Sequence, residues 1–140
     1  MSSVYFDTSA FVKILIEEPG SAPAVQAWQA ADSVACSRLL HAEARAALAM
    51  ARRQGRLSTL QHTSVKAALN ARWQDAYVVE VTEPLLEEAG DLAEDEALRG
   101  YDGVHLASAL RASVDTLITA DVEMIRAARS RGLKVIDSRS

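Results

Sequence analysis

Short runs of apolar, mostly β-branched residues alternate along the chain with longer segments in which apolar residues recur every three or four positions. A short apolar run is typical of a buried strand, and the longer periodic pattern is typical of a helix with one buried face. The runs predict strands at residues 4–6, 34–36, 77–81, 116–119 and 134–136. The periodic segments predict helices at about residues 9–17, 22–31, 39–53, 58–74, 82–98, 101–112 and 122–131. This alternation predicts a three-layer α/β/α fold with a central parallel sheet of about five strands.

The length of 140 residues fits one domain spanning residues 1–140, because no repeat, low-complexity tract or long linker divides the chain. Hydrophobic residues make up 49% and charged residues 24%, which excludes a disordered or collagen-like chain. No apolar run approaches the roughly 20 residues of a membrane helix, and residues 1–7 lack the features of a secretory signal. Cys36 is the single cysteine and is interpreted as inert packing. We therefore expect a cytoplasmic protein that does not enter a membrane.

Charge is distributed unevenly, although the net charge is only −4. Residues 38–72 contain seven bases and one acid, whereas residues 75–102 contain ten acids and one base. Both stretches have helical periodicity, so they are either two solvated helix faces of opposite sign or surfaces for docking a partner or RNA. Arg38, Arg45 and Arg52 form a stripe that points away from Glu43, which weakens its claim as the substrate track. Lys13 and Arg99 are the alternative phosphate contacts.

Two aspartates directly follow predicted strands. Asp7 comes after residues 4–6, and Asp121 comes after residues 116–119. In a parallel sheet the chemistry sits at the carboxyl ends of the strands, so both are candidate site residues. Each also precedes a predicted helix, where aspartate is a favoured N-cap. Taken alone, Asp7 and Asp121 can each be explained either as a site residue or as a helix N-cap.

Two further acids lie in apolar surroundings. Glu43 shares its predicted helix face with Leu39, Leu40, Ala46, Ala47 and Met50. A buried carboxylate without a cation costs several kcal/mol, so it must become neutral, form an ion pair with another element or bind a metal ion. Asp102 opens a helix that is apolar almost all round, where an acid also benefits from the helix dipole. If all four acids converge, their repulsion requires a hard, oxygen-loving cation such as Mg²⁺ or Mn²⁺, as in metal-dependent phosphoryl transfer or hydrolysis.

The segments around these four acids resemble the motifs of the PIN-domain nucleases. The resemblance rests on Asp-Thr-Ser-Ala-Phe-Val-Lys at residues 7–13, Ser-Arg-Leu-Leu-His-Ala-Glu at 37–43, Tyr-Asp-Gly-Val-His-Leu-Ala-Ser-Ala at 101–109 and Leu-Ile-Thr-Ala-Asp at 117–121. It extends over nearly the whole chain. Within this family the size and the lack of extra domains are most similar to VapC-type toxins of bacterial toxin–antitoxin pairs.

The resemblance implies a Mg²⁺-dependent endoribonuclease, with Mn²⁺ as an alternative, that cleaves RNA, binds a VapB-type antitoxin and forms a homodimer. It implies that Asp7, Glu43, Asp102 and Asp121 are the catalytic and metal-binding acids. It also implies supporting roles for Ser9 and Thr119, and for Glu123, which stands where many relatives have aspartate. His105 is interpreted as a packed histidine rather than a ligand, and Trp28 and Trp73 as core residues.

Two other functions within this fold stay open: a PIN nuclease of RNA processing outside any toxin pair, and a non-catalytic PIN-like module that binds protein. A receiver domain is disfavoured because Thr82, not aspartate, follows the third predicted strand. A haloacid-dehalogenase-like phosphatase is disfavoured because Ser9 stands where its second aspartate is needed. The chain has no phosphate-binding G-x-x-x-x-G-K-[ST] motif.

Overall fold

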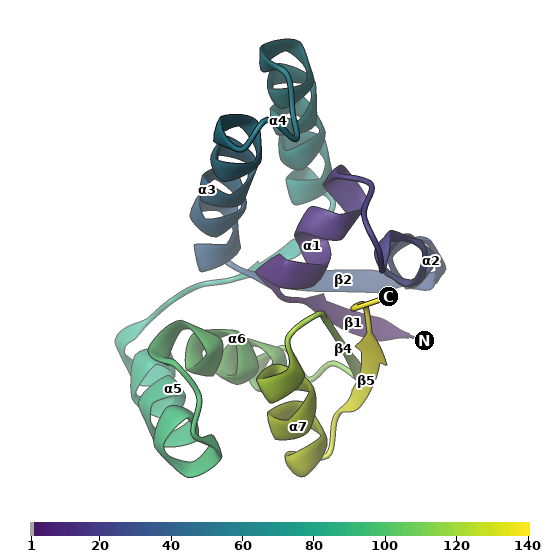
Figure 1. The fold of residues 1–140 in the computed structure, drawn as a ribbon. Helices are drawn as coiled ribbons and strands as arrows, with labels where there is room; N and C mark the ends of the chain where they lie inside the picture. The colour runs from purple at the N-terminus through teal and green to yellow at the C-terminus, as the bar shows by residue number, and fades with distance from the viewer. Residues whose placement is uncertain (1) are drawn as a thin grey trace.

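A five-stranded sheet forms the centre of the molecule in the computed structural model, which describes residues 2–140 (Figure 1). The strands are β1 (Ser3–Phe6), β2 (Ser33–Ser37), β3 (Tyr77–Val79), β4 (Thr116–Thr119) and β5 (Lys134–Asp137). They lie in the order β3-β2-β1-β4-β5, and every neighbouring pair is parallel. The predicted parallel sheet is confirmed.

Helices cover both faces of this sheet (Figure 1). One layer contains α1 (Thr8–Leu15), α2 (Ser21–Ala30), α3 (Leu39–Arg53) and α4 (Thr59–Gln74). The other contains α5 (Glu83–Glu96), α6 (Gly100–Arg111) and α7 (Val122–Ser130). The three-layer α/β/α architecture is therefore confirmed. Within residues 2–140, no helix combines the length and the apolar character that crossing a bilayer requires.

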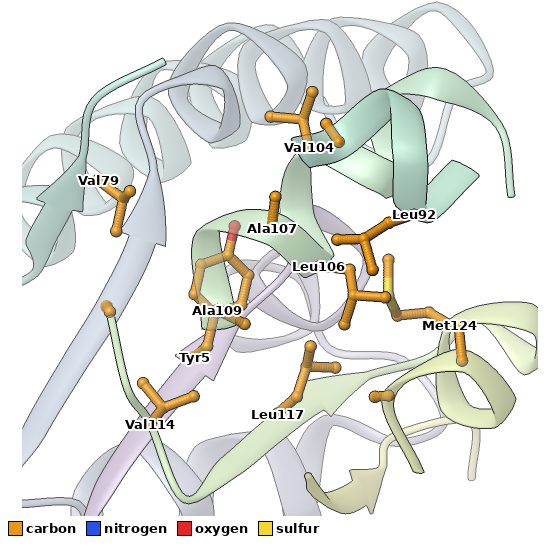
Figure 2. Packing of buried hydrophobic residues seen from close by; sticks show 14 of the residues in the cluster. Tyr5, Val79, Leu92, Val104, Leu106, Ala107, Ala109, Val114, Leu117 and Met124 are labelled. Carbon is orange, nitrogen blue, oxygen red and sulfur yellow. The ribbon is translucent and has the colours of Figure 1, made fainter. Parts of the chain in front are cut away.

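The alternation of side chains along the strands creates two cores. Tyr5 and Leu117 pack into the cluster beneath α5, α6 and α7, and Figure 2 shows them beside Leu106 of α6. Their neighbours Phe6 and Ile118 pack into the opposite cluster, beneath α1 to α4. Successive strand residues point to opposite faces, so a strand segment buried on both faces is mostly apolar. This explains the consecutive apolar residues at 4–6 in β1 and 117–118 in β4.

Aromatic rings fill part of the core under α1 to α4, and Trp28 and Trp73, which the sequence placed in the core, pack against it. Phe6, Phe11 and Trp28 pack edge to face, with ring centroids 5.5 to 6.5 Å apart. Trp73 also packs against this cluster. Cys36 is fully buried, and burial raises the pKa of its thiol to about 12. The thiol therefore stays protonated at neutral pH, as expected of inert packing.

The helix starts follow the capping residues in the sequence. The side chain of Asp7 accepts a hydrogen bond from the Ala10 amide, and that of Asp121 accepts from the Glu123 and Met124 amides. Thr82 caps α5, and Ser58 with Gln61 completes a capping box at α4. Asp7 and Asp121 are therefore N-caps, which fixes their positions at the sheet edge.

Several predicted boundaries were wrong by a few residues. The third strand ends at Val79 rather than residue 81, because its partner β2 ends at Ser37, which pairs with Val79. The first helix ends at Leu15, because Ile16 is already extended. The helix expected to reach residue 98 ends at Glu96, because Ala97 adopts a left-handed conformation.

The predicted apolar face of α3 was also wrong. The buried residues are Leu40, Ala44, Leu48 and Ala51, whereas Ala46 and Met50 are exposed. This buried stripe recurs every three or four residues and faces the sheet. Glu43 lies at its edge and is half-buried, so its carboxylate can reach α1 and α6 instead of entering the core.

Candidate functional site: a carboxylate cavity at the sheet edge

The site lies where the strand order reverses. From β1 the chain moves outward to β2 and β3, and then returns to place β4 on the other side of β1. The connections after β1 and β4 therefore run to opposite faces, which opens a crevice at the carboxyl edge of the sheet. Asp7 follows β1 and Asp121 follows β4. The topology brings these two aspartates, 114 residues apart in the sequence, to the same edge.

Asp7 is buried and held by three donors. Ser9 Oγ donates to Asp7 Oδ1 at 2.7 Å, the Ala10 amide donates to the same oxygen at 3.1 Å, and Thr119 Oγ1 donates to Oδ2. Burial raises the pKa of the Asp7 carboxyl, although the neighbouring His105 and these hydrogen bonds oppose the rise. The orientation of the carboxyl group is therefore fixed by the protein.

Ser9 and Thr119 link the ends of β1 and β4. Ser9 Oγ accepts a hydrogen bond from the Ala120 amide at 2.9 Å, and Thr119 Oγ1 accepts one from the Asp121 amide at 3.0 Å. The two hydroxyls lie 3.3 Å apart. Each hydroxyl therefore contacts Asp7 and also the backbone that leads to Asp121. Through these contacts the two hydroxyls connect Asp7 to the backbone of Asp121.

Glu43 is held by two side chains from other elements. Its Oε1 accepts hydrogen bonds from Thr8 Oγ1 at 2.6 Å and from His105 Nε2 at 2.7 Å. Desolvation alone would raise the pKa of Glu43, but the bonds from His105 and Thr8 outweigh it and hold this pKa below its ordinary value. Glu43 therefore remains an ionised carboxylate beside the crevice.

His105 is buried between Glu43 and Tyr5. Its Nδ1 lies 2.7 Å from the hydroxyl of Tyr5, and its ring packs edge to face on the Tyr5 ring. An ionised carboxylate only accepts hydrogen bonds, so His105 Nε2 is the donor in its bond to Glu43. Burial raises the pKa of Tyr5, so its hydroxyl stays protonated beside Nδ1. Tyr5 thus holds the His105 ring in place, and His105 holds Glu43.

A single arginine links the remaining two acids. Arg99 Nε donates to Asp102 Oδ2, and Arg99 Nη2 donates to Asp121 Oδ2, each at 2.9 Å. The guanidinium also lies over the Tyr101 ring, 4.8 Å from its centroid. Burial raises the pKa of Asp102 despite the opposing charge of Arg99. The Arg99 side chain itself is 62% exposed, so it is a solvent-facing counter-ion rather than a buried one.

All four predicted acids, Asp7, Glu43, Asp102 and Asp121, line one cavity of about 120 Å³. Thr8, Ser9, Arg99, Tyr101 and His105 complete its lining. A water molecule occupies roughly 30 Å³ of liquid, so the cavity has room for a small hydrated ion. Glu123 is not among the lining residues, and its carboxylate pairs with Arg126 at 3.2 Å.

The donor chemistry of this cavity fits a hard divalent cation. Its acids offer only carboxylate oxygens, which Mg²⁺ and Mn²⁺ prefer. As arranged in residues 2–140, no three acidic, histidine or cysteine side chains are close enough together to hold an ion. The guanidinium of Arg99 stands in as the cation between Asp102 and Asp121. The four acids therefore line one cavity, and Arg99 bridges two of them.

Sequence reasoning missed several residues of the cavity. Thr8 and Tyr101 were not singled out, although both adjoin predicted acids. His105 was interpreted as a packed histidine, and it is indeed buried, but it also contacts Glu43. The available signal was its spacing of three residues after Asp102, which places both on one side of α6. Arg99 was considered only as a phosphate contact, not as a bridge between acids.

Comparisons with known proteins agree with this geometry. The profile of the PIN domain matches residues 4–130. The chain is 40% identical to Ribonuclease VapC45 of Mycobacterium tuberculosis over 137 residues, which cover 96% of this chain and 95% of the relative. The structure of PAE2754 from Pyrobaculum aerophilum aligns with a TM-score of 0.72 at 21% identity, covering 96% of this chain and 83% of that one. A toxin–antitoxin complex from Klebsiella pneumoniae aligns with a TM-score of 0.67 at 18% identity, covering 96% and 97%. The chain therefore belongs to the PIN-domain family.

Proposed function

We propose that this protein is a metal-dependent endoribonuclease that hydrolyses RNA phosphodiester bonds. One observation carries the proposal: four carboxylates from four separate segments line a single cavity at the sheet edge. Clustered acids of this kind are costly unless they hold a cation, and a cation beside a phosphodiester is the arrangement of metal-assisted hydrolysis. The 40% identity to a protein named a ribonuclease supports the same activity.

In this proposal Asp7, Asp102 and Asp121 hold Mg²⁺ or Mn²⁺, directly or through water, with help from Glu43. When bound, such an ion lowers the pKa of water and offsets the negative charge that develops on the phosphoryl oxygens.

The chain's own residues supply orientation and a proton acceptor. Ser9 and Thr119 hold the Asp7 carboxyl in one orientation. Both donors to Glu43 use Oε1, so Oε2 is the oxygen that can accept a proton from a water beside the substrate. His105 and Tyr5 keep that carboxylate ionised and in place. Glu123 is proposed as a supporting acid at the rim, available only if it leaves Arg126.

Replacing Arg99 by glutamine is expected to strengthen metal binding in the absence of RNA. The ion must displace the exposed guanidinium that bridges the largely covered carboxylates of Asp102 and Asp121. Calorimetric titration with Mn²⁺ should therefore give an affinity about two- to fivefold higher for Arg99→Gln than for the wild type. Weaker binding by the variant would show that Arg99 supports the ion rather than competing with it.

The direct test of the proposed activity is cleavage of total cellular RNA by the purified protein. We expect cleavage with Mg²⁺ or Mn²⁺, none with excess EDTA, and recovery when Mg²⁺ is added back. Circular dichroism in EDTA checks that the protein remains folded when its cleavage activity is lost. A folded protein that cleaves no RNA with either ion would favour a non-catalytic binding module and overturn the proposal.

We further propose that this activity is the toxin of a VapBC-type pair, blocked by a small VapB-type antitoxin. The name of the relative VapC45 and the toxin–antitoxin complex among the structural neighbours support this assignment. A short neighbouring reading frame whose product co-purifies with the chain and stops cleavage is the expected result. Cleavage that this product leaves unchanged would favour an RNA-processing nuclease. The homodimer stays a prediction, which light scattering of the purified chain measures.

A further inference from the structure

A groove between α3 and α4 lies outside the carboxylate cavity. Two adjoining hollows, of about 220 and 330 Å³, share Arg45 and Lys66 in their linings, so they form one continuous feature. His41 and Asn70 line one part, and the methyl groups of Ala42, Ala46 and Ala49 line the other, together with His62. We call this feature the α3–α4 groove. Nothing in the proposed hydrolysis uses it.

The α3–α4 groove is positively charged and lacks compensating acids. No acidic residue lines it. Within residues 2–140, neither Arg45 nor Lys66 has a carboxylate within 4.0 Å, whereas Arg38 and Arg56 from the same basic stretch pair with Glu80 and Glu18. The net charge of the chain is −4, so a groove with unpaired cations on both sides is a local exception. Such a groove is typical of a binding site for an anionic ligand.

The groove adjoins the carboxylate cavity through α3. Ala42 lines the groove and the next residue, Glu43, lines the cavity. Consecutive helix residues differ by about 1.5 Å in height and point in directions roughly 100° apart, so the two features lie on neighbouring faces of one turn. A strand that enters the cavity can therefore continue along α3 into the groove.

Extended nucleic acid fits these observations better than a protein segment. The cavity presents four acids and one exposed arginine, so it cannot by itself hold a polyanion. Arg45 and Lys66 of the groove supply positive charge beside the carboxylate cavity. Its floor is made of alanine methyls, and it offers no large exposed apolar or aromatic anchor of the kind that dominates protein interfaces.

We propose that the α3–α4 groove is a phosphate-backbone subsite for RNA, with Arg45 and Lys66 contacting the strand beside the cleaved bond. This inference rests on the proposed ribonuclease activity. It predicts that the groove contributes to holding the strand and takes no part in the chemical step, because neither Arg45 nor Lys66 lines the cavity that contains the acids.

The test compares Arg45→Gln/Lys66→Gln with Arg129→Gln/Lys134→Gln, which removes the same charge from exposed positions on α7 and β5. Fluorescence anisotropy in EDTA measures the binding of a labelled single-stranded RNA without cleavage. The groove variant should bind about tenfold more weakly, and the slope of log K against log salt should fall by about 1.4, or 0.7 for each lost phosphate contact. In Mg²⁺ its KM should rise by a similar factor while kcat stays unchanged. The control should match the wild type in all three measurements.

Other outcomes separate this inference from the proposed activity. Cleavage by the wild type combined with unchanged RNA binding by the groove variant overturns the subsite and leaves the ribonuclease intact. If the wild type cleaves no RNA but the groove variant binds RNA more weakly than the wild type, the subsite is retained and the proposed nuclease activity is overturned. A groove variant that binds RNA normally but loses a co-purified antitoxin assigns the groove to protein and overturns the inference. Matching thermal unfolding of both variants checks that neither effect comes from misfolding.

Discussion

Asp7→Asn is expected to reduce RNA cleavage about 10³-fold, because an ion at this site supplies several kcal/mol of transition-state stabilisation. The amide has nearly the same shape as the carboxyl group. Its oxygen can accept from Ser9 and the Ala10 amide, and its NH₂ can donate to Thr119, whose hydroxyl can turn. The variant should therefore lose cleavage activity and ion binding but keep its fold. Initial rates in Mg²⁺ measure the activity, and circular dichroism measures the fold.

The same variant should be at least as stable as the wild type when no metal is present. Burial raises the pKa of Asp7 above its value in the unfolded chain. A carboxyl shifted in this direction stabilises the fold fully below its unfolded-state pKa and loses that contribution as the pH rises through its folded-state pKa. The amide does not titrate. In EDTA, the unfolding temperature of Asp7→Asn relative to the wild type should therefore increase as the pH rises above about 4, the ordinary pKa of an aspartate.

Asp91→Asn is the matched control, since Asp91 is an exposed acid on α5 outside the cavity. It should cleave RNA at the wild-type rate and show no such pH-dependent difference. Wild-type cleavage by folded Asp7→Asn would remove Asp7 from the proposed role. If Asp7→Asn does not fold, Asp121→Asn replaces it, because Asp121 lines the same cavity and its loss should also reduce cleavage.

Gly103→Ala is expected to destabilise the protein by about 1 to 3 kcal/mol, the usual cost of overpacking a close contact. A Cβ at Gly103 would collide with the backbone carbonyl of Ala89, and would also lie 3.3 Å from the Cβ of Ala93. Backbone cannot rotate aside as a side chain can, so α5 and α6, which lie side by side in Figure 1, must separate. For a chain of this size the unfolding temperature should fall by roughly 3 to 10 °C.

The substitution should also impair cleavage, because Gly103 stands next to Asp102 and two residues before His105 on α6. Displacing either by about 1 Å can cost up to about 100-fold in rate. Gly90→Ala is the control: Gly90 is also helical, and a Cβ there meets nothing within 4 Å. Calorimetry should show it equal to or more stable than the wild type, since alanine favours helix by about 1 kcal/mol. Equal stability of both variants would contradict the close α5–α6 contact.

Local patterns in the sequence were sufficient for most of the fold. The α3 bounds matched, and the helices expected from about residues 58 and 82 begin one residue later, directly after the caps Ser58 and Thr82. For Asp7 and Asp121, the interpretation as a helix N-cap and the interpretation as a site residue are compatible. Each caps a helix and each lines the cavity, because a helix that follows a parallel strand begins at the edge where sites form.

Contacts between distant elements could not be predicted in the same way. The bridge from Arg99 to Asp121 depends on how α6 sits against the start of α7, and the bond from His105 to Glu43 depends on the rotation of α3. Periodicity placed Glu43 among apolar residues, but two of those residues are exposed, so the direction of its face was misjudged. Such contacts are set by packing over long sequence separations, which no local pattern encodes.

Crystals soaked in Mn²⁺ test the central claim most directly, because the anomalous signal of the ion marks its position. The proposed site predicts a peak in the carboxylate cavity at roughly 2.1 Å from oxygens of Asp7, Asp102 or Asp121, or bridged to them by water, with Arg99 turned toward solvent. A cavity without a peak at saturating Mn²⁺, with Arg99 still between Asp102 and Asp121, would contradict it.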